Sequence, residues 1–167
     1  MKCITLSFIR LEMNSKISLT NVSFDFLSKS DKFLNLIIHN ISSCVLLLNK
    51  DMMLKAYNEP LKTIFSNKPE EEILYHKCGE VIGCAYSVEE EKECGTTSQC
   101  KTCSLRESAL QSYSDGTMIF KEKIEREFYT SNLKKELKHL QFSVRNFNFE
   151  NERYILMLID DITPLVN

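Results

Sequence analysis

Four cysteines in residues 84–103 constrain this chain more than any other feature of its sequence. Cys84, Cys94, Cys100 and Cys103 follow the spacing C-x9-C-x5-C-x2-C. The last two can reach one metal, and the nine residues after the first are enough for the chain to fold back. Thiolates bind zinc and iron–sulfur clusters, so this stretch predicts a metal centre with these four cysteines as ligands. The spacing disfavours the alternative of four unrelated free cysteines.

The residues alone leave the identity of the metal open. Four thiolates suit a tetrahedral zinc ion, and they suit a [4Fe-4S] or a [2Fe-2S] cluster equally well. Cys78 and His76 lie just upstream and are possible additional ligands, although a histidine in a short polar loop is usually exposed. We expect Gly95 to form a turn, and the polar residues 96–98 to offer N–H or O–H donors to sulfur.

Cysteine usage and the start of the chain indicate the compartment. The chain has 7 cysteines, an odd number with uneven spacing, which does not suggest a disulfide framework. Arg10 and Glu12 interrupt the first apolar residues before the core of a secretion signal is complete. We therefore predict a cytoplasmic protein, in which clustered cysteines bind metal in preference to forming disulfides.

Charge, apolar runs and motifs argue against several classes of function. A net charge of -2 gives no general attraction to nucleic acid or to an anionic membrane. The longest apolar runs, residues 44–48 and 154–159, are much shorter than the roughly 20 residues that span a bilayer. The sequence contains no catalytic triad, phosphate-binding loop or paired-carboxylate motif. We expect no nucleic-acid partner, no membrane insertion and no enzymatic activity.

The first regular elements predicted are a helix and a pair of strands. Apolar residues at helical spacing predict an amphipathic helix over residues 31–41. A buried strand over residues 44–48 follows, then a turn at residues 49–51 and a returning strand over residues 52–57.

Two helices are predicted beyond these strands. Asn58 is expected to cap a short helix with Pro60 in its first turn, where the missing N–H costs nothing. After the cysteines, residues 104–114 form a second helix that stops at Gly116. Its expected inner residues are Leu105, Ala109, Leu110 and Tyr113.

Three long strands are predicted for the rest of the chain. Residues 117–129 carry apolar residues of one parity, which predicts a strand with one face inward. Alternation continues through residues 140–144, and its change after Asn146 predicts a bulge or a turn near residues 150–152. Residues 154–159 are apolar without alternation, as in a strand covered on both faces. The inward residues of the first strand are expected to be Met118, Phe120, Ile124 and Phe128.

We expect one globular domain with short extensions, because the chain is long enough for one core and too short for two. Residues 1–30 form a loosely ordered leader and residues 164–167 a tail. The domain covers residues 31–163 and contains the cysteine loop at residues 76–103.

Three short motifs accompany this order of elements. They are LLNKD at residues 47–51, AYNEP at residues 56–60 and DDIT at residues 160–163. Together with the helix before a long hairpin, they resemble the PAS sensory domain family over residues 31–163. The resemblance implies an α+β fold, in which a five-stranded antiparallel sheet has short helices on one face and an N-terminal helix. It also implies a pocket for a ligand or cofactor between the sheet and the helix at residues 104–114.

The cysteine loop resembles that of a cysteine-bearing PAS subgroup from bacterial sensor proteins, and more distantly that of iron–sulfur PAS oxygen-sensor kinases. Those kinases use two C-x2-C pairs, whereas only Cys100 and Cys103 form such a pair here. Since zinc has no redox chemistry, the resemblance favours an iron–sulfur cluster over zinc.

The resemblance implies a sensor of oxygen or redox state that signals by protein contact. The implied downstream partner is a kinase or regulator. We also expect a second copy of the chain to bind through residues 1–41, because the apolar leader and the first helix need a surface that covers them. The alternative is a PAS ligand-binding or interaction module in which zinc only holds the loop in place.

Glutamates at 89, 90, 91 and 93 form a charge run beside the cysteines. Such runs are usually solvated loop faces, and that is our main interpretation. The alternative is that their charge lowers the reduction potential of a nearby cluster.

Overall fold

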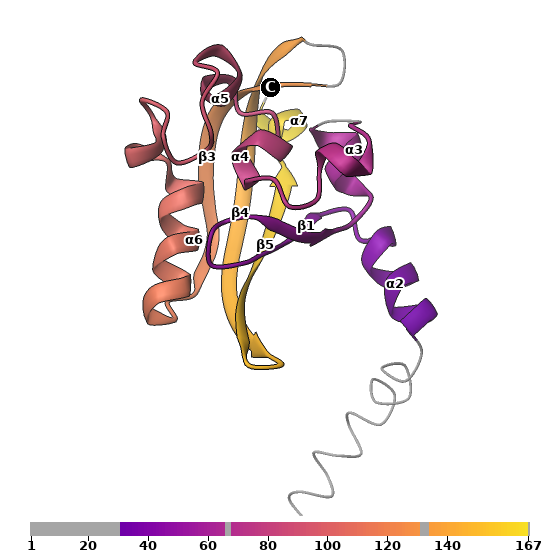
Figure 1. The fold of residues 1–167 in the computed structure, drawn as a ribbon. Coiled ribbons are helices and arrows are strands. Elements are labelled where there is room, and N and C mark those ends of the chain that lie inside the picture. Colours follow the sequence, from indigo (N-terminus) through magenta and orange to yellow (C-terminus); the bar gives the residue numbers. More distant parts are fainter. Residues whose placement is uncertain (1–30, 66–67, 131–133, 167) are drawn as a thin grey trace, which may run out of the picture. The chain divides into compact units, whose positions relative to one another are not determined.

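A computed structural model describes residues 31–65, 68–130 and 134–166 (Figure 1). The predicted leader, residues 1–30, lies outside the described residues.

The chain divides into two units, Met1–Ile38 and His39–Asn167. Helix α2, Asp31–Asn40, crosses this division and confirms the predicted helix to within one residue at its end. The second unit contains the sheet and all the cysteines that the structure describes.

Five strands of the second unit form one antiparallel sheet in the spatial order β2-β1-β5-β4-β3. This confirms the predicted α+β fold with a five-stranded antiparallel sheet. The strands are β1 Cys44–Leu48, β2 Leu54–Tyr57, β3 Ile119–Tyr129, β4 Lys135–Phe149 and β5 Glu152–Asp161.

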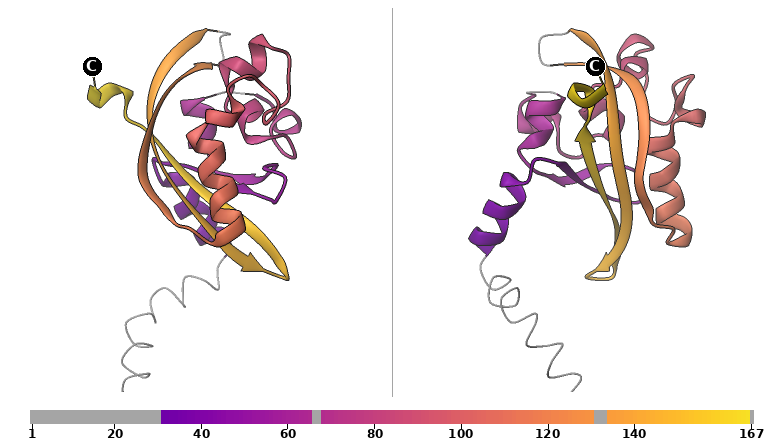
Figure 2. Two further views of the ribbon diagram at one scale, coloured as in Figure 1. Left: turned by 90° about the vertical axis from the view of Figure 1, so that its left-hand side faces the viewer. Right: turned by 180° about the vertical axis from the view of Figure 1, so that it is seen from behind.

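Helices α3 to α6 lie on the concave side of the curved sheet (Figure 2). Among these four helices, α6 alone is longer than two turns, so α3, α4 and α5 depend on packing against the sheet for their stability. The segments are α3 Pro60–Ile64, η1 Glu70–Glu72, α4 Cys78–Val81, α5 Ala85–Glu89, η2 Cys100–Thr102, α6 Ser104–Asp115 and α7 Thr163–Val166. The predicted tail at 164–167 therefore begins inside a short helix.

The hydrophobic core lies between the concave face of the sheet and these helices. Phe65 from the end of α3 and Phe128 from β3 meet edge to face, with ring centroids 5.3 Å apart. Alternation along β5 buries every second residue, but Leu156 and Leu158 on the other face are partly exposed. The prediction that this strand is covered on both faces is therefore wrong for the outer face. The core residues of the central strands are Cys44, Leu46, Leu48, Leu140, Phe142, Val144, Ile155, Met157 and Ile159.

Strand β3 contains a bulge that the sequence pattern did not predict. Its pairing with β4 shifts register just after Ile119, and Lys121 adopts a left-handed φ of 53°. One extra residue exchanges the two faces of a strand. As a result Ile119 packs on the core, whereas Met118 and Phe120 are 57% and 68% exposed. The prediction that Met118 and Phe120 point inward is wrong, and Phe128, beyond the bulge, is buried as predicted.

Strand β4 pairs with β5 in regular register from Leu140 to Phe149. Of the two alternatives predicted after Asn146, a bulge or a turn, the regular pairing with β5 excludes a bulge in this stretch, and the continued alternation places Phe147 on the outer face. There the Phe147 ring stacks on that of Tyr154, with centroids 5.9 Å apart. Residues 150–151 close the hairpin with two left-handed φ values, so the predicted turn is confirmed.

Helix α6 confirms its predicted position and ends at Gly116, whose φ of 83° is left-handed. The inner face of α6 differs in part from the prediction, because Leu110 is 40% exposed. Ser108 and Ser112 are buried in its place, together with Leu105. Small side chains at these positions let the helix axis approach the sheet closely.

Asn58 is a buried link to strand β1 and does not cap helix α3. Its Oδ1 accepts a hydrogen bond from Val45 N at 2.8 Å, and its Nδ2 donates to Ser43 O at 2.9 Å. The N-cap position of α3 is Glu59, without a side-chain cap. The prediction that Asn58 caps the helix is therefore wrong, whereas Pro60 does lie in the first turn.

Replacing Asn58 with alanine is expected to lower the free energy of unfolding by about 2 to 4 kcal/mol, because a fully buried amide is lost and two part-buried backbone groups lose their hydrogen-bond partners. Chemical denaturation followed by circular dichroism measures this change. Asn148→Ala is the control, since Asn148 is exposed and its Oδ1 is 3.4 Å from Arg153 Nε. Equal stability of the two variants would contradict the structural role of Asn58.

Candidate metal centre

The cysteine stretch is a series of very short helices that begin at or beside cysteines. Cys78 is the first residue of α4, and Cys84 is at the N-cap position of α5. Cys100 begins η2, and Cys103 immediately precedes α6. Cys94 lies in the turn between α5 and η2. Frequent changes of chain direction let these side chains approach one another from different sides.

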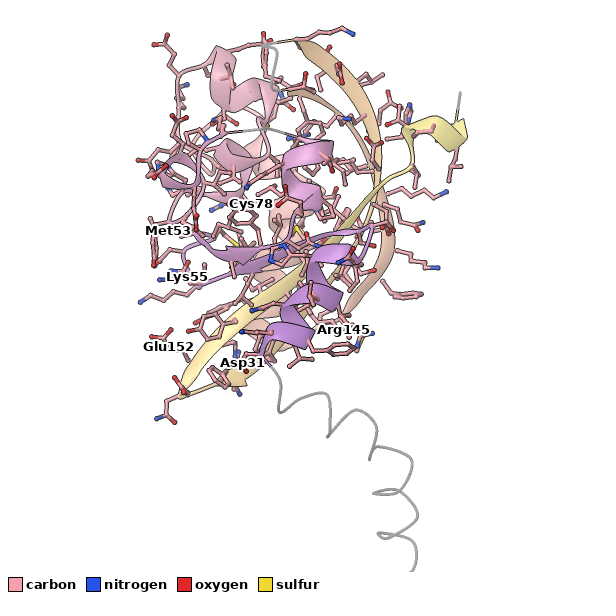
Figure 3. The ribbon with its side chains drawn as sticks, turned by 90° about the vertical axis from the view of Figure 1, so that its right-hand side faces the viewer. Asp31, Met53, Lys55, Cys78, Arg145 and Glu152 are labelled. Atoms are coloured by element: carbon pink, nitrogen blue, oxygen red, sulfur yellow. The ribbon has the colours of Figure 1, made fainter. Side chains whose placement is uncertain are left out.

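All five of these cysteines line one cavity of about 40 Å³. Cys78 is placed beside the residues that lead into β2, because its N–H donates to Met52 O and the preceding residue pairs with Met53 (Figure 3). The cavity is much smaller than the pockets of about 300 to 1,000 Å³ that hold drug-sized organic ligands, so it suits a compact group. Its apolar walls include Leu48, Phe128 and Met157 from the sheet and Leu105 and Ala109 from α6.

His76, the other possible ligand, is not among the described residues that line this cavity. Its Nδ1 lies 3.5 Å from Glu80 Oε2, and half of its side chain is exposed. The structure thus brings together the four predicted ligands and Cys78, and it places His76 outside the group.

Gly79 allows two cysteines to approach the backbone of α4. A Cβ at this position would lie 2.7 Å from Cys94 Sγ and 3.7 Å from Cys84 Cβ. The Gly79 N–H also donates to the Cys94 sulfur, which favours the thiolate. Sequence analysis missed Gly79, although a glycine between two cysteines was a signal for close packing.

Cys100 is the cysteine best prepared to be a thiolate. Gly95 N donates to its sulfur at 3.0 Å, and Thr97 Oγ1 lies 2.9 Å from it. Burial alone raises the pKa of Cys100, but the bonds from Thr97 and Gly95 and the charge of Arg106 outweigh burial and lower it. The prediction of donors after the turn is confirmed for Thr97.

The deeper cysteines have the opposite shift. Burial raises the pKa of Cys94 to about 11, although the Gly79 N–H opposes this. Burial also raises the pKa of Cys78, and the neighbouring Cys94 adds to the effect. Without a cation among them, these thiols stay protonated at neutral pH, and a metal would have to displace their protons.

Two arginines line the same cavity. Arg106, in the first turns of α6, lies over the backbone of Gly95, and Arg126 on β3 faces the ring of Tyr86 at 5.3 Å. Both bring positive charge to a cavity whose donors become negative when they ionise. No local pattern marks Arg126 as a neighbour of the cysteines, because it follows Cys103 by 23 residues and lies on the far side of α6 in sequence.

The glutamates beside the cysteines are exposed, except for the half-buried Glu90, but three of them hold the loop. Glu90 accepts hydrogen bonds from the N–H and the hydroxyl of Ser98. Glu93 pairs with Lys77 at 2.6 Å, and Glu89 pairs with Lys135 on β4 at 2.8 Å. Our main interpretation of a solvated face is therefore incomplete.

A backbone connection joins the cysteine stretch to the end of β3. Tyr129 N donates to Gly83 O at 2.7 Å, and Cys84 forms an isolated antiparallel bridge with Phe128. Gly83 has a left-handed φ of 72°. The cysteine stretch is thus hydrogen-bonded directly to the sheet.

Sulfurs around one small cavity fit a soft-metal centre. Among the described residues, however, no three His, Cys, Asp or Glu side chains already converge as a site for a metal ion. A single tetrahedral zinc ion, with Zn–S bonds of about 2.3 Å, needs sulfurs about 4 Å apart. The described cysteines line the cavity but do not converge in this way.

Solved PAS domains share this fold. The chain is 17% identical to the PAS domain of an HTR-like protein from Haloarcula marismortui, covering 81% of this chain and 100% of that one with a TM-score of 0.52. For the PAS domain of nitrogen regulation protein NR(II) from Vibrio parahaemolyticus, the identity is 13%, the coverage 77% and 96%, and the TM-score 0.52. The PAS domain of BvgS from Bordetella pertussis is 13% identical, with coverage of 79% and 85% and a TM-score of 0.52. The chain therefore has the PAS fold, as predicted.

No protein-family profile matches the sequence, and no curated protein is significantly similar to it. Across the described ranges, every helix is too short or too polar to cross a bilayer.

Proposed function

We propose that this chain is a sensory domain that holds an iron–sulfur cluster and responds to oxygen or redox state. The observation that carries the proposal is the small cavity lined by five cysteines, between the sheet and α6 of a PAS fold. Cys84, Cys94, Cys100 and Cys103 are the proposed ligands, with Cys78 as a possible replacement. When bound, the cluster supplies one-electron redox chemistry.

The chain's own residues would tune such a centre. N–H groups of Gly79 and Gly95 donate to sulfur, and donors of this kind stabilise ligand charge and raise a reduction potential. Arg106 and Arg126 add positive charge at the cavity wall.

Two elements beside the cysteines would pass a change in the cluster to the rest of the domain. Helix α6 starts directly after Cys103, and Cys84 is bridged to β3. We propose that shifts of these two elements change a contact with a second copy of the chain or with a signalling kinase or regulator. One PAS domain of the same fold comes from a two-component sensor histidine kinase.

A PAS interaction module with a structural zinc ion is the second candidate. It is favoured by the shortness of α4 and α5, four and five residues long, because helices of this length are not stable by themselves. Metal binding commonly holds such segments in place.

Anaerobic purification separates the two candidates. We expect brown protein with broad visible absorption, containing iron and acid-labile sulfide, whose absorption bleaches in air. We would measure the metal content by elemental analysis, the acid-labile sulfide chemically, and the visible absorption before and after exposure to air. Colourless protein with one zinc per chain would establish the second candidate instead.

Light scattering on the same sample tests the proposed dimer against the 19.4 kDa of one chain.

A further inference from the structure

The cysteine cavity meets an open groove on the surface of α6. The groove is lined by Gly95, Lys101, Leu110 and other residues of η2 and α6. Cys100 and Arg106 line both the groove and the cavity. At these two residues, therefore, a single layer of side chains separates the solvent in the groove from the cavity.

The absence of a side chain on Gly95 makes room for the Arg106 guanidinium in this position. A Cβ on Gly95 would lie 3.0 Å from Arg106 Cζ and 3.0 to 3.1 Å from its two terminal nitrogens. Only glycine lets the guanidinium lie this close to the chain. No described carboxylate forms an ion pair with Arg106 within 4.0 Å, so no strong bond prevents the side chain from moving aside.

We propose that Arg106 is a gate, which covers the solvent side of the cysteine cavity and limits how fast small reagents enter. In the proposed sensor the reagents are small oxidants such as dioxygen, and this part of the inference rests on the proposed function. The gate itself does not depend on the metal, because a bound centre and free thiols are reached through the same opening.

Alkylation by iodoacetamide, resolved for each cysteine by mass spectrometry, tests the gate on the full chain as isolated anaerobically. Arg106→Ala is expected to speed alkylation of Cys94 by about tenfold, because access controls the reaction of a buried thiol. Loss of a nearby positive charge disfavours the thiolate and acts in the opposite direction, so an increase reports access. Cys44 is the internal control, since it is fully buried in β1 and reacts only when the domain unfolds.

Two matched variants separate bulk from charge. Arg106→Met keeps a long side chain without charge. The alkylation rate of Cys94 in this variant should stay within about threefold of the rate in the natural protein. Lys101→Ala removes a charge from the groove alone and should leave the Cys94 rate unchanged.

An unchanged Cys94 rate in Arg106→Ala overturns the gate. If the alkylation rates of Cys94 and Cys44 rise together in Arg106→Ala, the gate is overturned as well. The same holds if Arg106→Met speeds alkylation of Cys94 as much as Arg106→Ala does. Iron and zinc are determined on the same samples, so a zinc protein with an intact gate would refute the iron–sulfur function and leave the gate standing.

Discussion

Replacing Cys94 with serine is expected to lower the bound metal per chain by about tenfold or more, because even the partners of metal ligands commonly contribute tenfold to affinity. The sulfur of Cys94 contacts Gly79 and accepts its N–H, so its position is fixed by the backbone of α4. A serine hydroxyl is a hard, weakly acidic donor that does not replace a thiolate on a soft metal. Iron, sulfide and zinc analysis of anaerobically purified protein measures the loss.

Two other cysteines provide controls for this experiment. Cys44→Ala removes a buried thiol in β1 that does not line the cavity, and metal content should be unchanged. Cys78→Ala tests the proposed ligand set, in which Cys78 is only a possible replacement. If Cys78→Ala loses the metal and Cys94→Ser keeps it, the assignment of the four ligands is wrong.

Local patterns were sufficient for most of the fold. The strand at residues 44–48, the helix after the cysteines and the hairpin turn follow from periodicity and turn residues, which act over a few positions. The bulge at Lys121 depends on how β3 pairs with β4, and periodicity within one strand does not contain that information. Asn58 also looked like a cap, because its local sequence suits one, but its buried hydrogen bonds reach across to β1.

The candidate site also contains residues that the local sequence predicted and residues that only the folded chain brings together. Cysteine spacing predicted that four cysteines of one short segment lie together, and these four line one cavity with Cys78, which was predicted only as a possible additional ligand. Their role as metal ligands stays a prediction. Arg126 comes from a strand beyond α6, and only the folded chain brings it to the cavity. Glu80 is close in sequence, yet its role in accepting the N–H of Cys94 at 3.1 Å had no motif to mark it.

Replacing Gly83 with alanine is expected to lower the free energy of unfolding by about 2 to 4 kcal/mol. The loss has two causes, because an alanine in a left-handed conformation is strained and a backbone hydrogen bond is broken. The φ of Gly83 is 72°, and a Cβ there would overlap the carbonyl oxygen of Tyr129. That contact lies beside the bond from Tyr129 N to Gly83 O, so the two chain segments must separate. Urea denaturation followed by circular dichroism measures the change.

Gly116→Ala is the matched control, because Gly116 has a left-handed φ of 83° with only Asn146 Nδ2 near its Cβ position, at 3.7 Å. It should cost about 1 to 2 kcal/mol, the penalty for the left-handed residue alone. Since Gly83 precedes Cys84, its replacement should also free the cysteine stretch from β3. Hydrogen exchange at the Tyr129 amide is then expected to accelerate in Gly83→Ala and not in Gly116→Ala. If the Tyr129 amide stays protected in Gly83→Ala, this backbone connection does not couple the cysteines to the sheet.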